Sequence, residues 1–398
     1  MRIVIGADSY APDINGSARF AGRLAHGLAA RGHEVHVVAA STTGPAGIEQ
    51  DGNVTVHRMR SIRYRWHATM RVCLPWLVGP AAQELLAELQ PDVVHVQCHL
   101  VIGRALINAA ERQRIPVVAT NHFVPENIFG YVPFLPRRLQ APAGRLAWRD
   151  FARVYGRADL ITAPTPLAIS LLENATGLSG EAVSNGIDVD RYWQAAQRAA
   201  AQRSAESVED GPVILFVGRL DQEKRVDELL GAFARIPAAT GARIEIVGGG
   251  DQESALHELA DHLQISNRVS FLGQIGDDEL LEAYGRASIF CMPGVAELQS
   301  LVTLEAMSAG KPVVAANAMA LPHLVRSGHN GWLYTPGDIG ELAMRLSTLV
   351  SDPELRRRMG QHSREIVARH DVETTLDIFT SMYASVGAAT RGELRPVA

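Results

Sequence analysis

Short apolar runs, rich in β-branched residues, alternate with longer amphipathic segments along the whole chain. In the first half these runs occupy residues 2–7, 34–40, 92–97, 116–120 and 159–163. In the second half they occupy residues 212–218, 243–249, 268–273, 287–292 and 311–316. Segments between them, such as 18–32, repeat their apolar positions every three or four residues, as one face of a helix does. This alternation predicts parallel sheets covered by helices on both faces, and therefore an α/β protein with two Rossmann-like domains.

The length of 398 residues fits two domains of ordinary size. We expect a first domain over residues 1–183, a hinge over 184–211 that starts as a helix and ends as a loop, a second domain over 212–370, and a C-terminal helix and tail over 371–398. The C-terminal helix is expected to cross back to the first domain. Open parallel sheets bind ligands at the carboxyl ends of their strands, so we expect the site in those loops, facing a cleft between the domains.

Composition and charge exclude several classes of protein. The net charge of −5 argues against a nucleic-acid-binding protein, which normally has a strongly basic domain. Residues 1–190 are net basic and the rest net acidic, so an anionic surface would meet the first half. The three cysteines fit neither a metal site nor a disulfide framework, and no apolar run approaches the length of about 18 residues that spans a bilayer. We therefore expect a cytoplasmic protein.

Two loops of the first domain carry candidate binding residues. Asn15 and Gly16 form a turn that leads into a helix, where glycine allows a ligand to approach and the helix amino end favours an anion. The same turn also fits an ordinary strand–helix connection. His122 follows the strand 116–120, so its ring would face the cleft and form hydrogen bonds near neutral pH. A packed histidine that caps the strand is the commoner outcome of this pattern.

The second domain offers two cations in the loop after its first strand. Arg219 and Lys224 precede a helix, and two cations at a helix amino end suit a pyrophosphate. Lys224 is one of only two lysines in an arginine-rich chain, which indicates a need for a compact point charge. The alternative is a solvated loop in which these cations pair with Asp221 or Glu223. Gly249, within a run of three glycines, could border phosphates, but the spacing is not the dinucleotide fingerprint and we expect no NAD site.

The segment AELQSLVTLEAMSAGKPVV (296–314) contains two carboxylates, Glu297 and Glu305. If a helix begins near Gln299, roughly 12 Å separate them, the span from the sugar to the ribose of an extended nucleotide sugar. Glu305 would then accept both ribose hydroxyls, and Glu297 would hold hydroxyls of the transferred sugar. The amides of residues 299–302 would meet the phosphates at the positive helix end. The alternative is that both glutamates are ordinary surface residues.

With these residues assembled, the chain resembles the retaining glycosyltransferases of family 4, which have the GT-B fold. The resemblance covers essentially the whole chain. It is carried by NG at 15–16, RGHEVHVV at 31–38, SNGID at 184–188, FVGRL…EK at 216–224, FLG at 271–273 and, most specifically, the paired glutamates followed by AMSAGKPVV.

The resemblance implies roles for the matching positions. The first domain would bind the acceptor and the second the nucleotide-sugar donor, which is a substrate; no cofactor and no metal are implied. Arg219 and Lys224 would bind the leaving diphosphate, Glu305 the ribose, and Glu297 the donor sugar. His122 would lie beside that sugar, contacting its 6-hydroxyl or stabilising charge near the anomeric carbon. The catalytic set is thus His122, Arg219, Lys224 and Glu297. The donor-binding set is Asn15, Gly16, Gly249, Ile275 (beside the nucleobase), Gln299, Ser300, Leu301 and Glu305.

One departure concerns the acceptor. The family usually has an aromatic residue and glycine after the first glutamate, where this chain has Leu298, Gln299 and Ser300. Glutamine there, together with NG in the first loop, is similar to enzymes that glycosylate diacylglycerol or phosphatidylinositol. The stretch 58–76 interleaves five arginines with aromatic and apolar residues, a pattern typical of an anchor on anionic lipid, and 137–157 adds further arginines. The alternative for 58–76 is a cleft-lining loop with a solvated basic face.

The expected reaction moves a hexose from a GDP-mannose or UDP-glucose type donor to an acceptor hydroxyl with retention of configuration. The acceptor would be a membrane lipid, with the enzyme peripheral at the inner face of the membrane. Three alternatives stay open: a transferase with a soluble acceptor (a natural-product aglycone or a sugar phosphate), a sugar-nucleotide epimerase of the same fold, and a non-catalytic nucleotide-sugar-binding protein.

Overall fold

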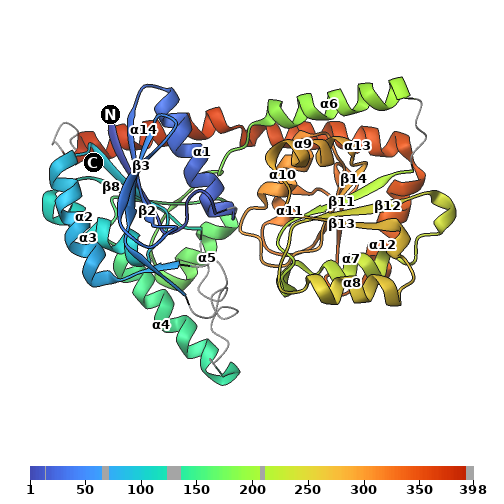
Figure 1. Ribbon diagram of the computed structural model, residues 1–398, viewed down its shortest axis with the longest axis horizontal. Helices are drawn as coiled ribbons and strands as arrows, with labels where there is room; N and C mark the ends of the chain where they lie inside the picture. Colours follow the sequence, from blue (N-terminus) through green and yellow to red (C-terminus); the bar gives the residue numbers. More distant parts are fainter. Residues whose placement is uncertain (14, 65–70, 123–135, 207–210, 391–398) are drawn as a thin grey trace. The chain divides into compact units, whose positions relative to one another are not determined.

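The computed structural model describes residues 1–13, 15–64, 71–122, 136–206 and 211–390 of the chain (Figure 1). These residues form two compact units. The first contains Met1–Asn185 together with the C-terminal residues from Glu373, and the second contains Gly186–Val372.

The first unit is built on an eight-stranded sheet with the order β10-β9-β8-β7-β1-β2-β4-β3. The strands are parallel except β3, which runs antiparallel to β4. Their bounds are β1 Arg2–Ala7, β2 Glu34–Ala40, β3 Gly47–Asp51, β4 Val54–Met59, β7 Val93–Val96, β8 Val117–Thr120, β9 Leu160–Ala163 and β10 Glu181–Ala182. The central strands are Val- and Ile-rich and fully buried, as expected of strands covered on both faces.

Six helices and a small hairpin complete this unit. The helices are α1 Gly16–Ala30, α2 Pro75–Leu89, α3 Val101–Gln113, α4 Arg137–Tyr155, α5 Pro166–Thr176 and α14 Val372–Thr390, and the hairpin pairs β5 Ser61–Arg63 with β6 Arg71–Cys73. Helix α14 packs on α1: Arg31 forms ion pairs with Glu373 and Asp377, and a side chain added at Gly27 would collide with Leu376. Helix α14 is therefore part of the first unit.

The second unit is built on a six-stranded parallel sheet with the order β13-β12-β11-β14-β15-β16. The strands are β11 Val213–Val217, β12 Arg243–Val247, β13 Val269–Gly273, β14 Ile289–Met292, β15 Val313–Ala316 and β16 Gly331–Tyr334. The helices are α6 Val189–Glu206, α7 Val226–Phe233, α8 Glu253–His262, α9 Asp277–Arg286, α10 Leu301–Ser308, α11 Leu321–Leu324, α12 Ile339–Ser351 and α13 Pro353–Val367, with 3₁₀ turns η2 Gln222–Lys224, η3 Ala238–Thr240, η4 Ser266–Arg268 and η5 Ala368–His370. Figure 1 shows α9 and α10 on one side of this sheet and α7, α8 and α12 on the other.

The predicted α/β class, with a covered parallel sheet in each of two Rossmann-like units, is confirmed. The segment expected to be a hinge forms helix α6, which packs on α9 and α10 as part of the second unit. The packing is close, because a Cβ at Gly285 would lie 2.7 Å from the Cβ of Ala199. Residues 207–210, at the end of that segment, lie outside the described residues.

Candidate active site

The second unit has a topological switch point between β11 and β14. From β11 the chain adds β12 and β13 on one side, and then returns to add β14, β15 and β16 on the other. The loops after β11 and β14 therefore lie at the carboxyl edge of the sheet where the strand order reverses, which is the usual ligand position in open α/β sheets. These two loops carry Arg219, Lys224 and Glu297.

Lys224 and Glu297 meet at this point. The Lys224 ammonium, on the turn η2, donates to Oε1 of Glu297, and only 14% and 11% of the two side chains are exposed. The backbone N–H of Val295 also donates to the carbonyl of Glu223 (3.0 Å), so the two loops are joined twice. Gly294 leaves room for the pair, since a Cβ there would lie 3.3 Å from Glu297 Oε1 and 3.4 Å from Lys224 Cδ.

Arg219 is held by acidic neighbours in its own loop. Its guanidinium contacts Asp221 and donates to Glu223 Oε1 (3.0 Å), with 45% of the side chain exposed. This is the pairing foreseen as the alternative for Arg219. A diphosphate that binds Arg219 would therefore have to displace these two carboxylates from its guanidinium.

The glycine run after β12 joins its loop to the loop after β11. Leu220 N–H donates to the carbonyl of Gly249 and Gln252 N–H donates to that of Leu220 (3.0 and 2.9 Å). A Cβ at Gly248 would lie 1.9 Å from the Gly218 carbonyl oxygen, and one at Gly250 2.7 Å from backbone atoms of Leu220. A Cβ at Gly249 would meet only side-chain atoms, at 3.3 Å or more. Two of the three glycines are thus required by close approach of backbone, and Gly249 is the least constrained.

The loop after β14 leads into helix α10, which begins at Leu301, two residues later than expected, with Ser300 as its N-cap. Gln299, Ser300 and Leu301 are all buried. The Ser300 hydroxyl accepts a hydrogen bond from Thr303 Oγ1 (2.8 Å), and the Ser300 carbonyl accepts from the N–H of Leu304 (3.1 Å). The positive end of α10 therefore lies at the switch point, three residues after Glu297.

Glu305 lies in the second turn of α10 and is only 1% exposed, so the surface alternative is wrong for this residue. Tyr284 on α9 donates its hydroxyl to Glu305 Oε2 (2.7 Å) and also lies 3.2 Å from the Val302 carbonyl. No pattern in the sequence distinguishes Tyr284 from other core tyrosines. Its contact with Glu305 depends on α9 and α10 packing on the same face of the sheet.

Ile275 occupies a neighbouring loop at the same edge. It follows β13, precedes Gly276 at the start of α9, and is half-buried against the core of the second unit. Its backbone therefore lies at the carboxyl end of β13, two strands away from β11.

In the first unit, Asn15 is the N-cap of α1. Its Oδ1 accepts a hydrogen bond from the backbone N–H of Ala18 (3.0 Å), and its amide donates to Ser9 Oγ (2.6 Å). Gly16 is the first residue of the helix, and both residues are exposed. The turn therefore has the structural role considered as its alternative, while it leaves the amino end of α1 open to solvent.

His122 lies just beyond β8, where Nε2 is 2.7 Å from Gln97 Oε1 and the ring packs on Phe20 with centroids 4.8 Å apart. Burial lowers the pKa of His122 to about 3, so the imidazole is neutral at physiological pH. Gln97 was not predicted. The rule that selected His122, a polar side chain at the end of a central strand, applies equally to Gln97 at the end of β7.

Asp8, directly after β1, is a second residue that sequence reasoning missed. Its Oδ1 accepts a hydrogen bond from the backbone N–H of Ile102 at the start of α3 (3.1 Å). Burial raises the pKa of Asp8 to about 6, although the hydrogen bonds from the α3 backbone act in the opposite direction.

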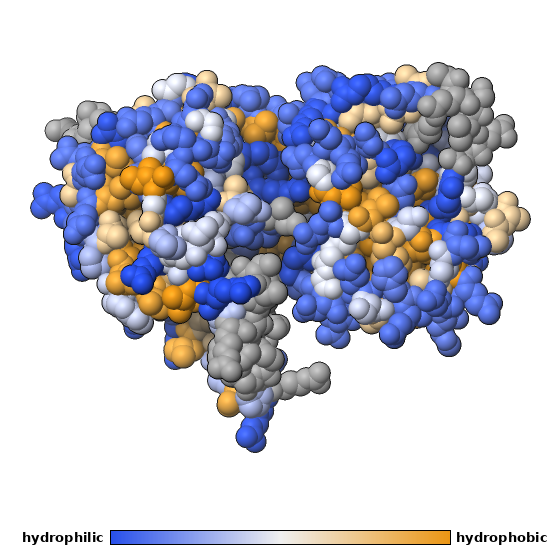
Figure 2. Space-filling view, in the orientation of Figure 1, coloured by the Kyte–Doolittle hydropathy of each residue, from blue (hydrophilic) through white to orange (hydrophobic). Residues whose placement is uncertain are grey.

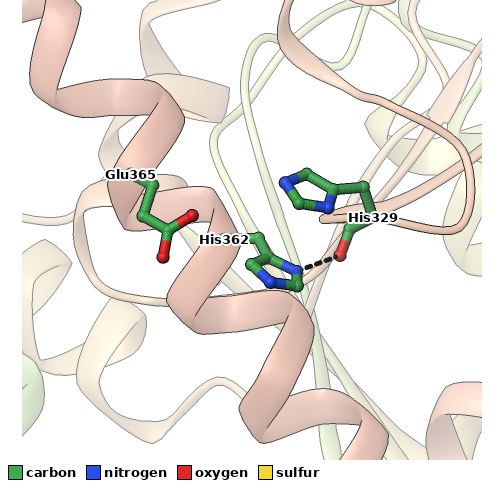
Figure 3. A group of neighbouring side chains, drawn as sticks. All are labelled: His329, His362 and Glu365. Carbon is green, nitrogen blue, oxygen red and sulfur yellow. Dashed lines mark hydrogen bonds between the residues drawn. The ribbon is translucent and has the colours of Figure 1, made fainter.

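One group of side chains with metal-ligand chemistry occurs among the described residues: His329, His362 and Glu365 (Figure 3). The two imidazole rings are stacked, with centroids 3.8 Å apart and planes inclined by 10°, and His362 Nδ1 lies 2.9 Å from the His329 carbonyl oxygen. Ring nitrogens bind metals in the plane of the ring, so two parallel rings do not direct their lone pairs at a shared ion. This arrangement is a ring stack and does not form a preformed metal centre.

Within the part of the chain that the structure describes, no helix is both long enough and apolar enough to cross a membrane.

Two α/β units, with cations and carboxylates collected at a switch point beside a helix amino end, define the class of GT-B glycosyltransferases. A family model for group 1 glycosyl transferases matches residues 197–366, and one for glycosyltransferase family 4 matches residues 14–191. A GDP-mannose-dependent alpha-mannosyltransferase of Mycobacterium tuberculosis is 30% identical over 360 residues, 88% of this chain and 87% of that protein. The chain therefore belongs to the family 4, group 1 glycosyltransferases.

Further similarities agree with this family. The sulfoquinovosyl transferase SQD2 of Arabidopsis thaliana is 27% identical over 309 residues, which are 76% of this chain and 58% of that longer protein. The crystal structure of Anabaena HepE in complex with UDP-glucose matches with a TM-score of 0.75 at 22% identity, over 97% of this chain and 100% of that one. The predicted GT-B fold is confirmed.

Proposed function

We propose that this glycosyltransferase moves a hexose from a nucleotide-diphosphate sugar to an acceptor hydroxyl and retains the anomeric configuration. The observation that carries the proposal is the convergence of Lys224, Glu297 and the amino end of α10 at the switch point of the second unit. A cation, a sugar-binding carboxylate and a positive helix end are the groups that a sugar diphosphate requires. The GDP-mannose and UDP-glucose named for two similar proteins suggest the two donor types to test.

Each part of the donor has a partner in this arrangement. The diphosphate would lie at the start of α10, with Lys224 and Arg219 neutralising its charge, and Glu297 would accept hydrogen bonds from the sugar hydroxyls. Glu305 would accept the ribose diol.

In the reaction, the bond between the anomeric carbon and the β-phosphate oxygen breaks, and the acceptor oxygen bonds to that carbon from the same face. The acceptor proton passes to a phosphate oxygen of the departing nucleotide. The negative charge that develops on the diphosphate is met by Lys224, Arg219 and the helix end, in place of a metal ion, which is electrostatic stabilisation of the transition state. His122, which the resemblance assigns to the donor sugar, is neutral.

We propose a membrane lipid as the acceptor. Trp76 and Leu77 at the start of α2 are 69% and 39% exposed, and Leu139 and Leu146 on α4 are 46% and 66% exposed. Arg138, Arg145 and Arg149 lie on α4 with the exposed leucines. Figure 2 shows apolar surface among hydrophilic residues on the visible face of the first unit. Apolar and cationic side chains together suit binding at an anionic lipid surface.

The stretch 58–76 contributes Ile62, which is 46% exposed, Trp76 and the exposed Arg60 and Arg63 to this surface, whereas Arg58 is buried and paired with Glu49. Its centre, residues 65–70, lies outside the described residues. The location that follows is the cytoplasm, with the enzyme peripheral at the inner face of the membrane.

The transfer is tested by nucleotide release from GDP-mannose and from UDP-glucose, each with diacylglycerol or phosphatidylinositol vesicles and with a sugar phosphate. Release that depends on one donor and on the lipid, and is lost in Lys224→Ala and Glu305→Ala, supports the proposal. Three other outcomes would each replace the proposal with one of its alternatives. They are transfer to the soluble acceptor only, formation of an epimerised donor, and nucleotide binding without turnover. Normal turnover in either variant would refute the residue assignment.

Membrane binding is tested separately by co-sedimentation with vesicles that contain anionic lipid. We expect Trp76→Ser/Leu146→Ser to lose most of the sedimented fraction. Met344→Ser, which changes a 53% exposed residue on α12 of the second unit, should sediment like the unaltered protein. Equal sedimentation of all three proteins would mean that this surface is not the membrane contact.

A further inference from the structure

A chain of polar side chains leads from the C-terminal helix α14 to His122. Tyr383 OH lies 2.6 Å from His95 Nδ1, and His95 Nε2 lies 2.6 Å from Thr120 Oγ1 and 3.4 Å from Gln97 Nε2. Gln97 Oε1 then lies 2.7 Å from His122 Nε2. His95 and Thr120 are fully buried, and Gln97 and Tyr383 are each 1% exposed. These four side chains, which lead up to His122, are therefore shielded from water.

Adjacent parallel strands place these side chains together. His95 and Gln97 are two positions apart at the end of β7, and Thr120 and His122 are two positions apart at the end of β8. Residues two apart on a strand share a face, so each pair projects to one side of the sheet. The register pairs His95 with Val118, which brings the two strand ends alongside each other.

With the Gln97 oxygen facing His122 and its amide nitrogen facing His95, the hydrogen bonds indicate where the protons are. An amide oxygen only accepts, so His122 must carry its proton on Nε2 to bond with Gln97 Oε1. The Gln97 amide nitrogen only donates, so His95 Nε2 is unprotonated and accepts from it and from the Thr120 hydroxyl. His95 then carries its proton on Nδ1 and donates it to the Tyr383 oxygen.

Burial keeps both rings neutral. The pKa of His95 is lowered to about 3, first by burial and then by the neighbouring His122. A neutral imidazole has one donor and one acceptor nitrogen, so the bond to Gln97 decides which nitrogen His122 offers to a ligand.

We propose that Gln97 is a positioning residue that holds His122 in the Nε2-protonated form and so presents Nδ1 as a hydrogen-bond acceptor. His95 and Tyr383 hold the Gln97 amide in the required orientation. The inference deepens the proposed function, because it rests on the role toward the donor sugar that the resemblance assigns to His122. An acceptor nitrogen takes a hydrogen bond from a sugar hydroxyl, whereas the other tautomer would donate one.

The first test needs no substrate. In protein labelled with ¹⁵N-histidine, the ¹⁵N shifts of a neutral ring distinguish the two tautomers, and His122→Asn identifies the His122 signals by their loss. We expect the Nε2-protonated form in the unaltered protein and a mixture of tautomers in Gln97→Leu. The matched control is Gln113→Leu, which deletes another partly buried glutamine whose amide bonds to the Gln83 carbonyl (3.0 Å), and it should leave the signals unchanged.

The second test is kinetic. Removing a group that orients a site residue commonly costs about 10- to 100-fold in activity, so we expect kcat of Gln97→Leu to fall by that factor with a donor KM within about threefold. Tyr383→Phe acts one step further away and should lose less. A His122 tautomer that is unchanged in Gln97→Leu, or a kcat equal to that of Gln113→Leu, would overturn the inference. If no transfer is detected for the unaltered protein, the proposed function fails while the NMR result still decides the role of Gln97.

Discussion

The ammonium of Lys224 donates a hydrogen bond to the carboxylate of Glu297, although 73 positions separate the two residues in the chain. The contact joins the loops after β11 and β14 on the two sides of the switch point. Both side chains are mostly buried, so each ion depends on the other to offset its loss of water. The pair therefore keeps the cation in position beside the carboxylate that we propose binds the donor sugar.

Removing one member of this pair should affect stability and activity separately. Lys224→Met leaves Glu297 charged and without its cation, which should cost about 3 kcal/mol in the free energy of unfolding. The double variant Lys224→Met/Glu297→Gln removes both charges and should recover most of that loss. Its kcat/KM should remain about 100- to 1000-fold below that of the unaltered enzyme, because the charge on the leaving diphosphate is no longer met. Urea denaturation and nucleotide release measure the two effects.

The control for this cycle is Arg357→Met, which deletes an exposed ion pair with Glu354 on α13. Exposed pairs of this kind contribute little, so unfolding and turnover should both be unchanged. A double variant that regains full turnover would show that the ion pair only joins the two loops.

The glycine run supplies a prediction that distinguishes neighbouring positions. Gly250→Ala places a methyl group 2.7 Å from backbone atoms of Leu220, which cannot move without breaking the bonds that join the two loops. We expect it to lower the free energy of unfolding by about 2–3 kcal/mol and to weaken nucleotide binding. Gly249→Ala meets only the end of the Glu253 side chain, at 3.3 Å, and should cost less than about 1 kcal/mol. Similar losses at both positions would contradict the close-approach argument.

The periodicity of the sequence was sufficient to predict the central strands of both sheets, because parallel strands buried on two faces must be apolar along their length. It did not predict β3, β4 and β10 of the first sheet or β16 of the second. The strand ends then identified the loops that carry Arg219, Lys224 and Glu297. The pairing within those loops could not be predicted, since Lys224 had nearby acids in its own loop and instead contacts one on the far side of the switch point. That choice depends on the order of strands in the sheet, which local patterns do not encode.

The contacts that surround the candidate residues could not be predicted. Glu305 was expected to be reachable by a ribose, whereas the structure buries it against Tyr284. The C-terminal helix was expected to return to the first unit, but its sequence gave no sign that Tyr383 would bond to His95. In both cases a tyrosine on the buried side of a helix forms a hydrogen bond with a neighbouring element. An apolar residue at the same position would give the same hydrophobic periodicity, so the sequence pattern does not reveal the bond.

Tyr284 should affect donor binding through Glu305. Tyr284→Phe keeps the ring in the core and removes the hydroxyl that donates to Glu305 Oε2, so the carboxylate is no longer fixed for the ribose diol. We expect the Kd of the preferred nucleoside diphosphate to rise roughly tenfold, as hydrogen bonds to charged groups are among the stronger ones. Isothermal titration calorimetry with GDP and UDP measures this change.

Tyr334→Phe is the matched control, because Tyr334 donates its hydroxyl to another buried glutamate of the same unit, Glu228 (2.8 Å). It should reduce stability to a similar extent and leave nucleotide affinity unaltered. An equal loss of affinity in the two variants would indicate a general loosening of the second unit and would remove the specific role assigned to Tyr284.

The stability of the first unit should depend on pH through groups whose pKa values the fold shifts strongly, among them three histidines and Asp8. The pKa values of His95 and His122 are lowered to about 3 and that of His99 to about 4, so each contributes stability that is present above pH 6.5 and is lost as the pH falls toward these values. The pKa of Asp8 is raised to about 6, so its contribution has the opposite sign and is lost as the pH rises from 3.8 through 6. Between pH 6 and 4, Asp8 therefore offsets one of the three histidines.

Variants separate these contributions, because the difference from the unaltered protein cancels every other titrating group. His95→Gln should make the free energy of unfolding less dependent on pH in this window, by about 1.4 kcal/mol per pH unit. Asp8→Asn should make the loss on acidification steeper by a similar amount and should stabilise the protein at pH 7, where the buried carboxylate is charged. Urea denaturation at half-unit steps from pH 4 to 7 measures the slopes. Destabilisation by Asp8→Asn at pH 7 would contradict this expectation. It would mean that the hydrogen bond from the Ile102 N–H to the charged carboxylate outweighs the cost of burying that charge at the start of α3.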